Sequence, residues 1–219
     1  MKKANVLRFL HDNPDFLAEH ADELGIRLRE SKMRTFSEAK LAAADRKIDT
    51  IARHMADMTE NAEHNHAMLD KLTRLNLSLM ACNTLQQVDT ALRDSLNADF
   101  VLPHFDWFLL QTPAKKLRMP ASLMLPENHA ARGALRKLHA PQCDTRLLHK
   151  SLEKRLPENA ESESFLHLPL RFHDTTLGVL LIGHPDPNYF APDAPTTYVA
   201  MMGAALGATL ARIMGLRAA

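Results

Sequence analysis

The chain of 219 residues has little glycine, little cysteine and no long block of charge of one sign. Its 7 glycines are scattered singly, which excludes a glycine-rich phosphate loop and a dinucleotide-binding fingerprint. Cys82 and Cys143 lie far apart, which excludes a disulfide framework and a CxxC metal or redox motif. Because 27 basic residues nearly balance 26 acidic ones, we expect neither nucleic-acid binding nor a polybasic membrane anchor.

What is abundant is leucine and alanine. The 35 Leu and 30 Ala against 5 Val and 5 Ile predict much more helix than strand. Residues 194–211 carry no charge and contain Gly203-xxx-Gly207, a packing motif of membrane helices. Their Ala, Gly, Thr and Met content favours a buried helix of a soluble protein over a membrane span. The apolar run after Lys3 is broken by Arg8, too early for a signal peptide, so we predict a cytoplasmic protein.

Three parts follow one another along the chain. Residues 1–34 predict short helices, with Asn13 as an N-cap and Pro14 in the first helical position. Residues 35–82 contain neither Pro nor Gly and predict one long helix that is capped at Thr35. Residues 83–219 alternate short helices and strands and predict a compact α+β domain.

The long helix carries a seam with alternating steps of three and four residues, which is typical of a left-handed coiled coil. We predict that this seam pairs two copies of the chain in parallel; folding back onto residues 4–28 is the open alternative. Asn65 either fixes the register of the pair or marks where the helix emerges into solvent, and for Asn76 we favour an end of the seam at the folded domain. The seam consists of Leu41, Ala44, Ile48, Ile51, Met55, Met58, Ala62, Asn65, Leu69, Leu72, Asn76 and Leu79.

The compact part has two clear local signals. Thr84 predicts the cap of a helix whose apolar face holds Leu85, Val88, Leu92 and Leu96. Residues 165–172 and 177–184, joined by a polar loop of four residues, predict a β-hairpin. The second arm is apolar on both faces and is expected in the centre of a sheet, whereas Pro169 in the first arm predicts an edge or a bulge.

One pocket is the candidate site. If the aromatic face of the strand after residue 104 lines a cavity, Phe105, Trp107 and Leu109 form its apolar wall, and His167 and Arg171 are its polar handles. The alternative is that these aromatic side chains fill the core. No metal-ligand spacing occurs among the 12 histidines, and no nucleophile motif is present, so we assign no catalytic residue, metal or cofactor.

Two stretches resemble known families. The run from Ser164 through Pro169-Leu170, Leu177-Gly178-Val179-Leu180 and Ile182-Gly183 to Asp186 and Phe190 is similar to the closing half of a GAF domain. Together with Asn5-Val6, Phe9-Leu10 and Pro14-Asp15-Phe16-Leu17, the whole chain resembles the bacterial DUF484 family. The resemblance implies a GAF-like domain, an antiparallel sheet flanked by helices and roofed by residues 112–156. No biochemical activity is established for that family.

The resulting hypothesis is a non-enzymatic, dimeric sensory or regulatory protein. Its GAF-like domain would bind an unidentified small molecule or a protein partner. The alternative hypothesis is a scaffold whose pocket is filled by its own side chains and whose N-terminal helices recruit a partner. The residue patterns that mark cyclic-nucleotide and bilin binding in GAF domains are not evident, and Cys143 lacks the neighbours of a chromophore attachment site.

Overall fold

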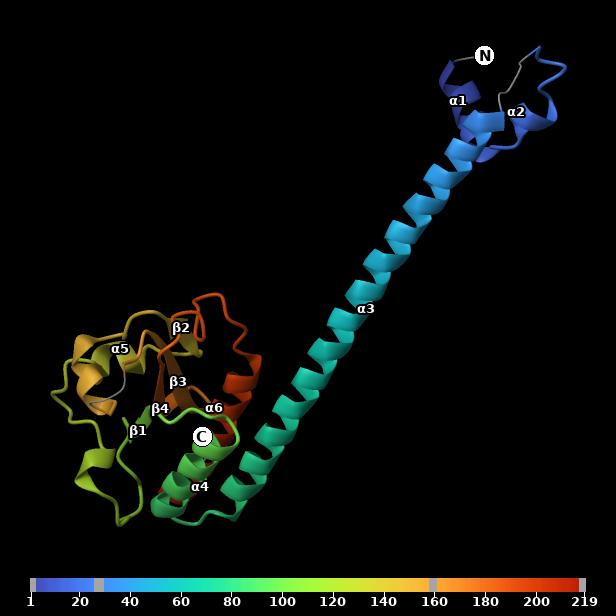
Figure 1. The fold of residues 1–219 in the computed structure, drawn as a ribbon. Helices are drawn as coiled ribbons and strands as arrows, with labels where there is room; N and C mark the ends of the chain where they lie inside the picture. The colour runs from blue at the N-terminus through green and yellow to red at the C-terminus, as the bar shows by residue number, and fades with distance from the viewer. Residues whose placement is uncertain (1–2, 26–29, 158–160, 217–219) are drawn as a thin grey trace. The chain divides into compact units, whose positions relative to one another are not determined.

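The computed structural model describes residues 3–25, 30–157 and 161–216, except for the side chains of Ala18 and residues 30–38. The chain divides into two compact units, Met1–Ala62 and Glu63–Ala219. The division falls inside the long helix α3 (Glu30–Ala81), because the last turns of this helix belong to the core of the second unit. Figure 1 labels the elements of both units.

The first unit has helices joined by turns and no strand in its described residues. It contains α1 (Lys3–Asp12), α2 (Phe16–Glu19) and the beginning of α3. The side-chain amide of Asn13 donates to the carbonyl oxygen of Phe9 at 3.0 Å, so this residue caps the end of α1. It does not cap α2, which begins at Phe16 instead of Pro14. The long helix also starts earlier than predicted, and Thr35 lies within it.

The second unit is built on a four-stranded antiparallel sheet. The strands are β1 (Phe105–Leu109), β2 (Gln142–Asp144), β3 (Ser164–Phe172) and β4 (Thr175–His184), in the order β1-β4-β3-β2. The apolar strand β4 is therefore central, as predicted. The hairpin turn is two residues long instead of four, because Phe172 pairs directly with Thr175. A bulge follows Pro169 at Leu170 and Arg171, as that proline predicts.

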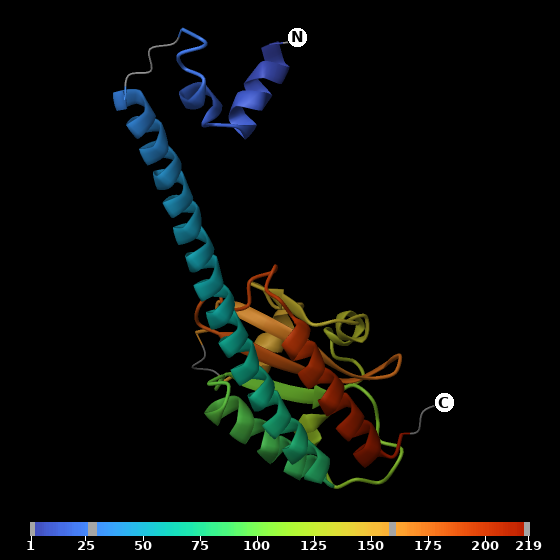
Figure 2. The same ribbon diagram turned by 90° about the vertical axis from the view of Figure 1, so that its right-hand side faces the viewer.

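Three helices cover one face of the sheet: the end of α3, α4 (Leu85–Ala98) and α6 (Thr197–Met214) (Figure 2). The predicted cap of α4 is confirmed, because Thr84 and Gln87 exchange the two hydrogen bonds of a capping box. Its predicted apolar face is also confirmed, since all four residues are buried. The core between these helices and the sheet includes Leu72, Leu75, Leu79, Leu85, Val88, Leu92, Leu96, Trp107, Leu168, Leu180, Leu206 and Leu210.

The other face of the sheet is covered by shorter elements. These include α5 (Arg132–Arg136) and the 3-10 helix η2 (Lys150–Arg155), while a second 3-10 helix, η1 (Ala121–Leu123), adjoins β1. Both covering helices are short, because α5 has 5 residues and η2 has 6. The buried guanidinium of Arg132 donates to the carbonyl oxygens of Leu110 and Leu125, which fastens the segment that follows β1.

Helix α6 lies close against β3. A Cβ atom on Gly207 would overlap the carbonyl oxygen of Arg171, and one on Gly203 would come within 2.7 Å of the Leu168 side chain. The absence of a side chain at these two glycines therefore allows α6 to pack closely against the sheet. By length and composition alone, α6 is the one helix in the described residues that could cross a membrane, and half of it is buried within the unit. It ends at Gly215, whose φ of 75° is the left-handed conformation of a helix C-cap.

An arginine on α6 holds the end of α3. The Arg212 guanidinium donates to the carbonyl oxygens of Met80 at 3.4 Å and of Cys82, and to the side-chain oxygen of Asn83 at 3.3 Å. Carbonyls at the end of a helix lack partners within the helix and carry partial negative charge, so a cation there is favourable. This contact joins the two ends of the compact unit.

Candidate functional site

The five side chains predicted to line one pocket do not lie together. Residues that pair across a sheet share a face, and Trp107 pairs with Leu180, which pairs with Leu168. Phe105, Trp107 and Leu109 therefore face the helix layer, where each is at most 5% exposed.

His167 and Arg171 have the opposite parity on β3 and lie on the other face of the sheet. We therefore correct the prediction of a shared cavity. The strand register, which the sequence does not reveal, places the aromatic side chains in the core.

The face of the sheet that carries His167 is filled by the protein itself. Apolar side chains from the sheet meet others from α5, η2 and the segment after β1, and all of them are buried. Where the resemblance implied a roofed pocket, the described residues thus form a packed second core. Its members are Phe108, Leu110, Leu125, Ala131, Leu135, Leu152, Leu156, Phe165, Val179 and Leu181.

His167 is a structural group within this second core. Its Nε2 accepts a hydrogen bond from the backbone N–H of Leu148 at 3.2 Å, which ties the segment before η2 to the sheet. Burial lowers the pKa of His167 to about 4, against the smaller opposing effects of the Gln142 backbone and the Asp144 charge. The imidazole is therefore neutral at pH 7 and accepts this bond in its neutral form.

Arg171 also serves the fold. Its guanidinium donates to the carbonyl oxygen of His139 at 3.1 Å and lies 4.0 Å from a carboxylate oxygen of Asp174 in the hairpin turn. The first contact holds the segment between α5 and β2 against the sheet. The Thr176 hydroxyl holds the same segment, because it donates to the carbonyl oxygen of Leu138 at 3.3 Å.

A different pocket lies at the β1 edge of the sheet, and we call it the edge pocket. Its volume is about 920 Å³, large enough for a small organic ligand. Helix α4, strand β1, the segment from residue 118 to η1, and η2 contribute its walls. It is lined by Thr84, Leu85, Gln86, Asp89, Arg93, Asp106, Trp107, Arg118, Met119, Pro120, Ser122, Leu123, Lys154 and Arg155.

One network in the edge pocket joins α4 to β1. The indole N–H of Trp107 donates to one carboxylate oxygen of Asp89 at 2.8 Å, and Arg93 Nε donates to the other at 2.9 Å. Asp89 and Arg93 are four residues apart on α4, a spacing at which helix side chains meet. The bond raises the pKa of Arg93, whose guanidinium also lies over the Phe105 ring.

A second network joins β1 to the two 3-10 helices. Arg155 Nε lies 2.6 Å from a carboxylate oxygen of Asp106, and another nitrogen of Arg155 donates to the carbonyl oxygen of Ser122 at 2.9 Å. Burial raises the pKa of Asp106, and the charge of Arg155 counteracts that effect. Because Asp106 and Trp107 point to opposite faces of β1, the pocket wraps around the sheet edge.

The sequence pattern does not reveal the edge pocket. The one signal that pointed towards it was the placement of Asp89 and Arg93 beside the apolar face of α4. Arg118, Lys154 and Arg155 come from irregular or 3-10 segments, where no periodicity shows which side chains converge. Of the predicted pocket residues, Trp107 alone lines the edge pocket.

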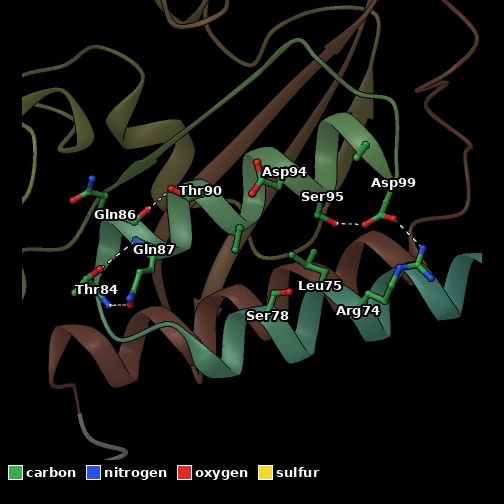
Figure 3. A pocket seen from close by; sticks show the side chains of 12 residues that line it. Arg74, Leu75, Ser78, Thr84, Gln86, Gln87, Thr90, Asp94, Ser95 and Asp99 are labelled. Atoms are coloured by element: carbon green, nitrogen blue, oxygen red, sulfur yellow. Dashed lines mark hydrogen bonds and ion pairs between the residues drawn. The ribbon is translucent and has the colours of Figure 1, made fainter.

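Most of the residues that line a groove between the end of α3 and α4 are polar (Figure 3). Across it Arg74 pairs with Asp99 at 2.9 Å, and the Ser95 hydroxyl donates to the same carboxylate at 3.2 Å. Hydrogen bonding to Arg74 lowers the pKa of Asp99, so this carboxylate stays ionised. The ion pair of Arg74 and Asp99 fastens α4 to α3.

The predicted seam divides between two environments. Leu41, Ile48, Ile51, Met55 and Met58 lie in the first unit and are 50–71% exposed. By contrast, Leu72 and Leu79 are 2% and 1% exposed in the core of their own domain, so we correct their assignment to the seam. Leu69, which also belongs to the predicted seam, is 40% exposed. Leu77 and Met80, which lie outside the predicted seam, are the other large exposed apolar residues in the last turns of α3. Asn65 is exposed, and Asn76 is half-buried beside the core.

A physical reason explains this division. A strict seven-residue repeat drifts about 20° per heptad around a straight α-helix. After four or five heptads, Leu72 and Leu79 have therefore rotated away from the face that holds Leu41 and Ile48. The single repeat seen in the sequence therefore combines residues from two different apolar faces of α3.

The described residues offer little for metal binding or for thiol chemistry. They contain no cluster of three His, Cys, Asp or Glu side chains able to hold a metal ion. Cys82 and Cys143 are free thiols, and burial raises the pKa of both, so they are protonated at neutral pH.

Comparison with known proteins gives a family and a fold. The family model described as "Protein of unknown function, DUF484" matches residues 1–214. The GAF domain of a phosphoenolpyruvate-protein phosphotransferase from Coxiella burnetii is similar, with a TM-score of 0.51 and 16% identity over 68% of this chain and 97% of that chain. The GAF domain of an Acinetobacter phosphoenolpyruvate-protein phosphotransferase has a TM-score of 0.50 and 16% identity, over 68% of this chain and 96% of that chain. No curated protein matches. The GAF-like α+β fold expected from the sequence is thereby confirmed.

Proposed function

The chain belongs to the DUF484 family, and on that premise we propose that it is a non-enzymatic regulatory homodimer. In this proposal the first unit pairs two copies through α3. The GAF-like unit recognises a small molecule or a protein partner, and the two copies respond together. GAF domains are typically sensory modules of regulatory proteins, which supports a regulatory role.

The observation that carries the proposal is the exposed apolar stripe on α3, formed by Leu41, Ile48, Ile51, Met55 and Met58. Large apolar side chains at helical spacing along one face favour a covering partner, because their burial removes apolar surface from water. A second copy of the same helix supplies a matching stripe. A parallel coiled coil buries both stripes along their full length.

The compact unit offers a route from a binding event to α3. The edge pocket is lined by α4, and α4 is fastened to α3 by the pair of Arg74 and Asp99. From the other side Arg212 of α6 holds the carbonyls at the end of α3. A ligand that shifts α4 would therefore act on the helix that forms the dimer.

A second candidate function is a scaffold, and one specific observation favours it. The sheet face that would be roofed over a ligand is filled by buried apolar side chains such as Phe108, Leu135 and Leu152. Helix α1 exposes Leu7 and Phe9, and the turn after α2 exposes Leu24. These three side chains are 47–59% exposed and are suited to contact a partner protein. Both candidates place the protein in the cytoplasm, in keeping with its free thiols.

The mass of the protein in solution tests the proposal. We expect light scattering to give twice the 24.6 kDa of one chain. In the variant Ile51→Asp/Met55→Asp, charge on the stripe should dissociate the dimer. The matched variant Ala42→Asp/Thr50→Asp places the same charges on the opposite side of α3 and should stay dimeric.

Two outcomes would overturn the homodimer. One is a monomeric wild-type protein, which would favour the alternative that α3 folds back onto residues 4–28. The other is a dimer that survives the stripe variant as well as the control variant. Circular dichroism at 222 nm shows whether the variants keep their helices, so loss of folding is distinguished from loss of pairing.

A further inference from the structure

The edge pocket carries an excess of positive charge. Four cationic side chains, Arg93, Arg118, Lys154 and Arg155, line it together with two acidic ones. Both acids are already engaged, Asp89 by Arg93 and Asp106 by Arg155. Among the described residues, Arg118 and Lys154 are in no ion pair, which leaves two cations facing the pocket.

The same pocket has an apolar wall. Leu85 and Trp107 are buried behind it, and Met119 and Leu123 are half-buried where they pack against the main core. A ligand that fits both features combines an apolar body with an anionic group. The fixed ion pairs on either side hold the pocket in shape, since they tie α4, β1 and the 3-10 helices together.

We propose that the edge pocket binds a small organic phosphate, with the phosphate group between Arg118 and Lys154 and the apolar body against Met119, Leu123 and the edge of Trp107. The inference rests on the proposed regulatory function and names the ligand class of its sensory unit. A phosphate monoester carries a charge of about −1.5 to −2 at pH 7, which matches two unpaired cations. Guanidinium and ammonium groups both donate charge-assisted hydrogen bonds to phosphate oxygens.

Other ligand classes fit this pocket less well. A cation would meet the excess positive charge and would have to compete with Arg93 and Arg155 for the two carboxylates. A neutral apolar compound would leave Arg118 and Lys154 without a counter-charge. A monocarboxylate would bring a charge of −1 to these two cations, less than the charge of about −1.5 to −2 on a phosphate ester.

The single tryptophan of the chain provides a local reporter. Trp107 gives the one indole N–H signal in a ¹⁵N–¹H NMR spectrum, and this N–H donates to Asp89 in the pocket wall. We expect phenyl phosphate to shift that signal in a saturable titration of the full-length protein. Inorganic phosphate, benzoate and benzyl alcohol, which each lack part of the proposed chemistry, should bind more weakly.

The decisive variant is Arg118→Gln/Lys154→Gln. Both side chains are exposed, so the substitutions should leave the fold intact. Phenyl phosphate should bind about tenfold more weakly or worse, because its charge-assisted hydrogen bonds are lost. The control Arg136→Gln/Lys137→Gln removes the same charge from exposed positions outside the pocket and should bind as the wild-type protein does.

The proposal is overturned if phenyl phosphate leaves the indole signal unmoved, or if both double variants bind it equally. Benzyl alcohol that binds as tightly as phenyl phosphate also overturns it, in favour of an apolar ligand. These outcomes are independent of the measured mass. A dimer without phosphate binding removes this inference alone, whereas a monomer that binds phenyl phosphate removes the proposed dimer.

Discussion

Single residues in the second unit combine polar chemistry with complete burial. His167 is wholly buried yet polar, and its Nε2 accepts a hydrogen bond from the Leu148 N–H. A buried polar group costs little free energy when it is paired, and its partner would lose a bond if the side chain were removed. Burial thus keeps the His167 imidazole uncharged, and its hydrogen bond fixes the position of the Leu148 backbone.

His167 predicts a pH dependence of stability. Its pKa is about 4 in the folded protein against 6.5 ordinarily, so the unfolded chain binds more protons as the pH falls through this range. Its contribution to the free energy of unfolding is therefore full above pH 6.5 and declines towards pH 4, by up to about 3 kcal/mol.

Urea unfolding at several pH values checks this prediction. His167→Gln keeps a hydrogen-bond acceptor on a side chain of similar reach but does not titrate between pH 7 and 4. The variant should be less stable at pH 7 and should lose less stability on acidification than the wild-type protein. Parallel pH profiles of the two proteins would contradict the assignment.

At the scale of elements, helix α6 shows how two small residues set a packing distance. Gly203 and Gly207 bring the helix against the backbone of β3, and Gly207 faces the Arg171 carbonyl. The same spacing in an uncharged helix is typical of membrane helix pairs. In this unit the closely approaching partner is a strand, and α6 thereby reaches the end of α3 through Arg212.

Gly207→Ala should therefore destabilise the protein. The added methyl group meets backbone that cannot move away without displacing β3, and such overpacking costs about 1–3 kcal/mol. Gly133→Ala in α5 is the matched control, because no atom lies within 4 Å of its added Cβ; it should be neutral or slightly stabilising. Thermal unfolding followed by circular dichroism compares the two variants, and equal midpoints would contradict the close packing.

On the scale of the whole molecule, one helix serves two purposes. The beginning of α3 exposes its apolar stripe, whereas Leu72, Leu75 and Leu79 at its end are core residues of the GAF-like unit. Pairing of two stripes would couple the stability of each chain to its neighbour. A folded domain and a dimerisation surface would then share a single secondary-structure element.

This coupling predicts that thermal stability depends on chain concentration. A dimer is favoured by mass action, so the midpoint of unfolding at 222 nm should rise as the protein concentration is raised. In Ile51→Asp/Met55→Asp the midpoint should be lower and independent of concentration. A wild-type midpoint that does not change with concentration would contradict pairing through α3.

Local signals in the sequence predicted several elements correctly. Thr84 followed by Gln87 specifies a helix start, because the capping box needs only those neighbouring residues. The hairpin followed from two apolar runs joined by a polar loop, and the central position of β4 followed from its apolar residues on both faces. The length of the hairpin turn and the start of α3 differed from the prediction, since local patterns define the boundaries of elements weakly.

The sequence by itself determined the helix-rich composition, the family, the long helix and the apolar faces of α4 and β4. Tertiary structure alone decided what covers each apolar face. Strand register separated Trp107 from His167, and core packing took Leu72 and Leu79 away from the seam. Tertiary structure also brought side chains from four distant segments together to form the edge pocket. The physical reason is that periodicity shows which side of an element avoids water, whereas its partner depends on contacts between residues far apart in the chain.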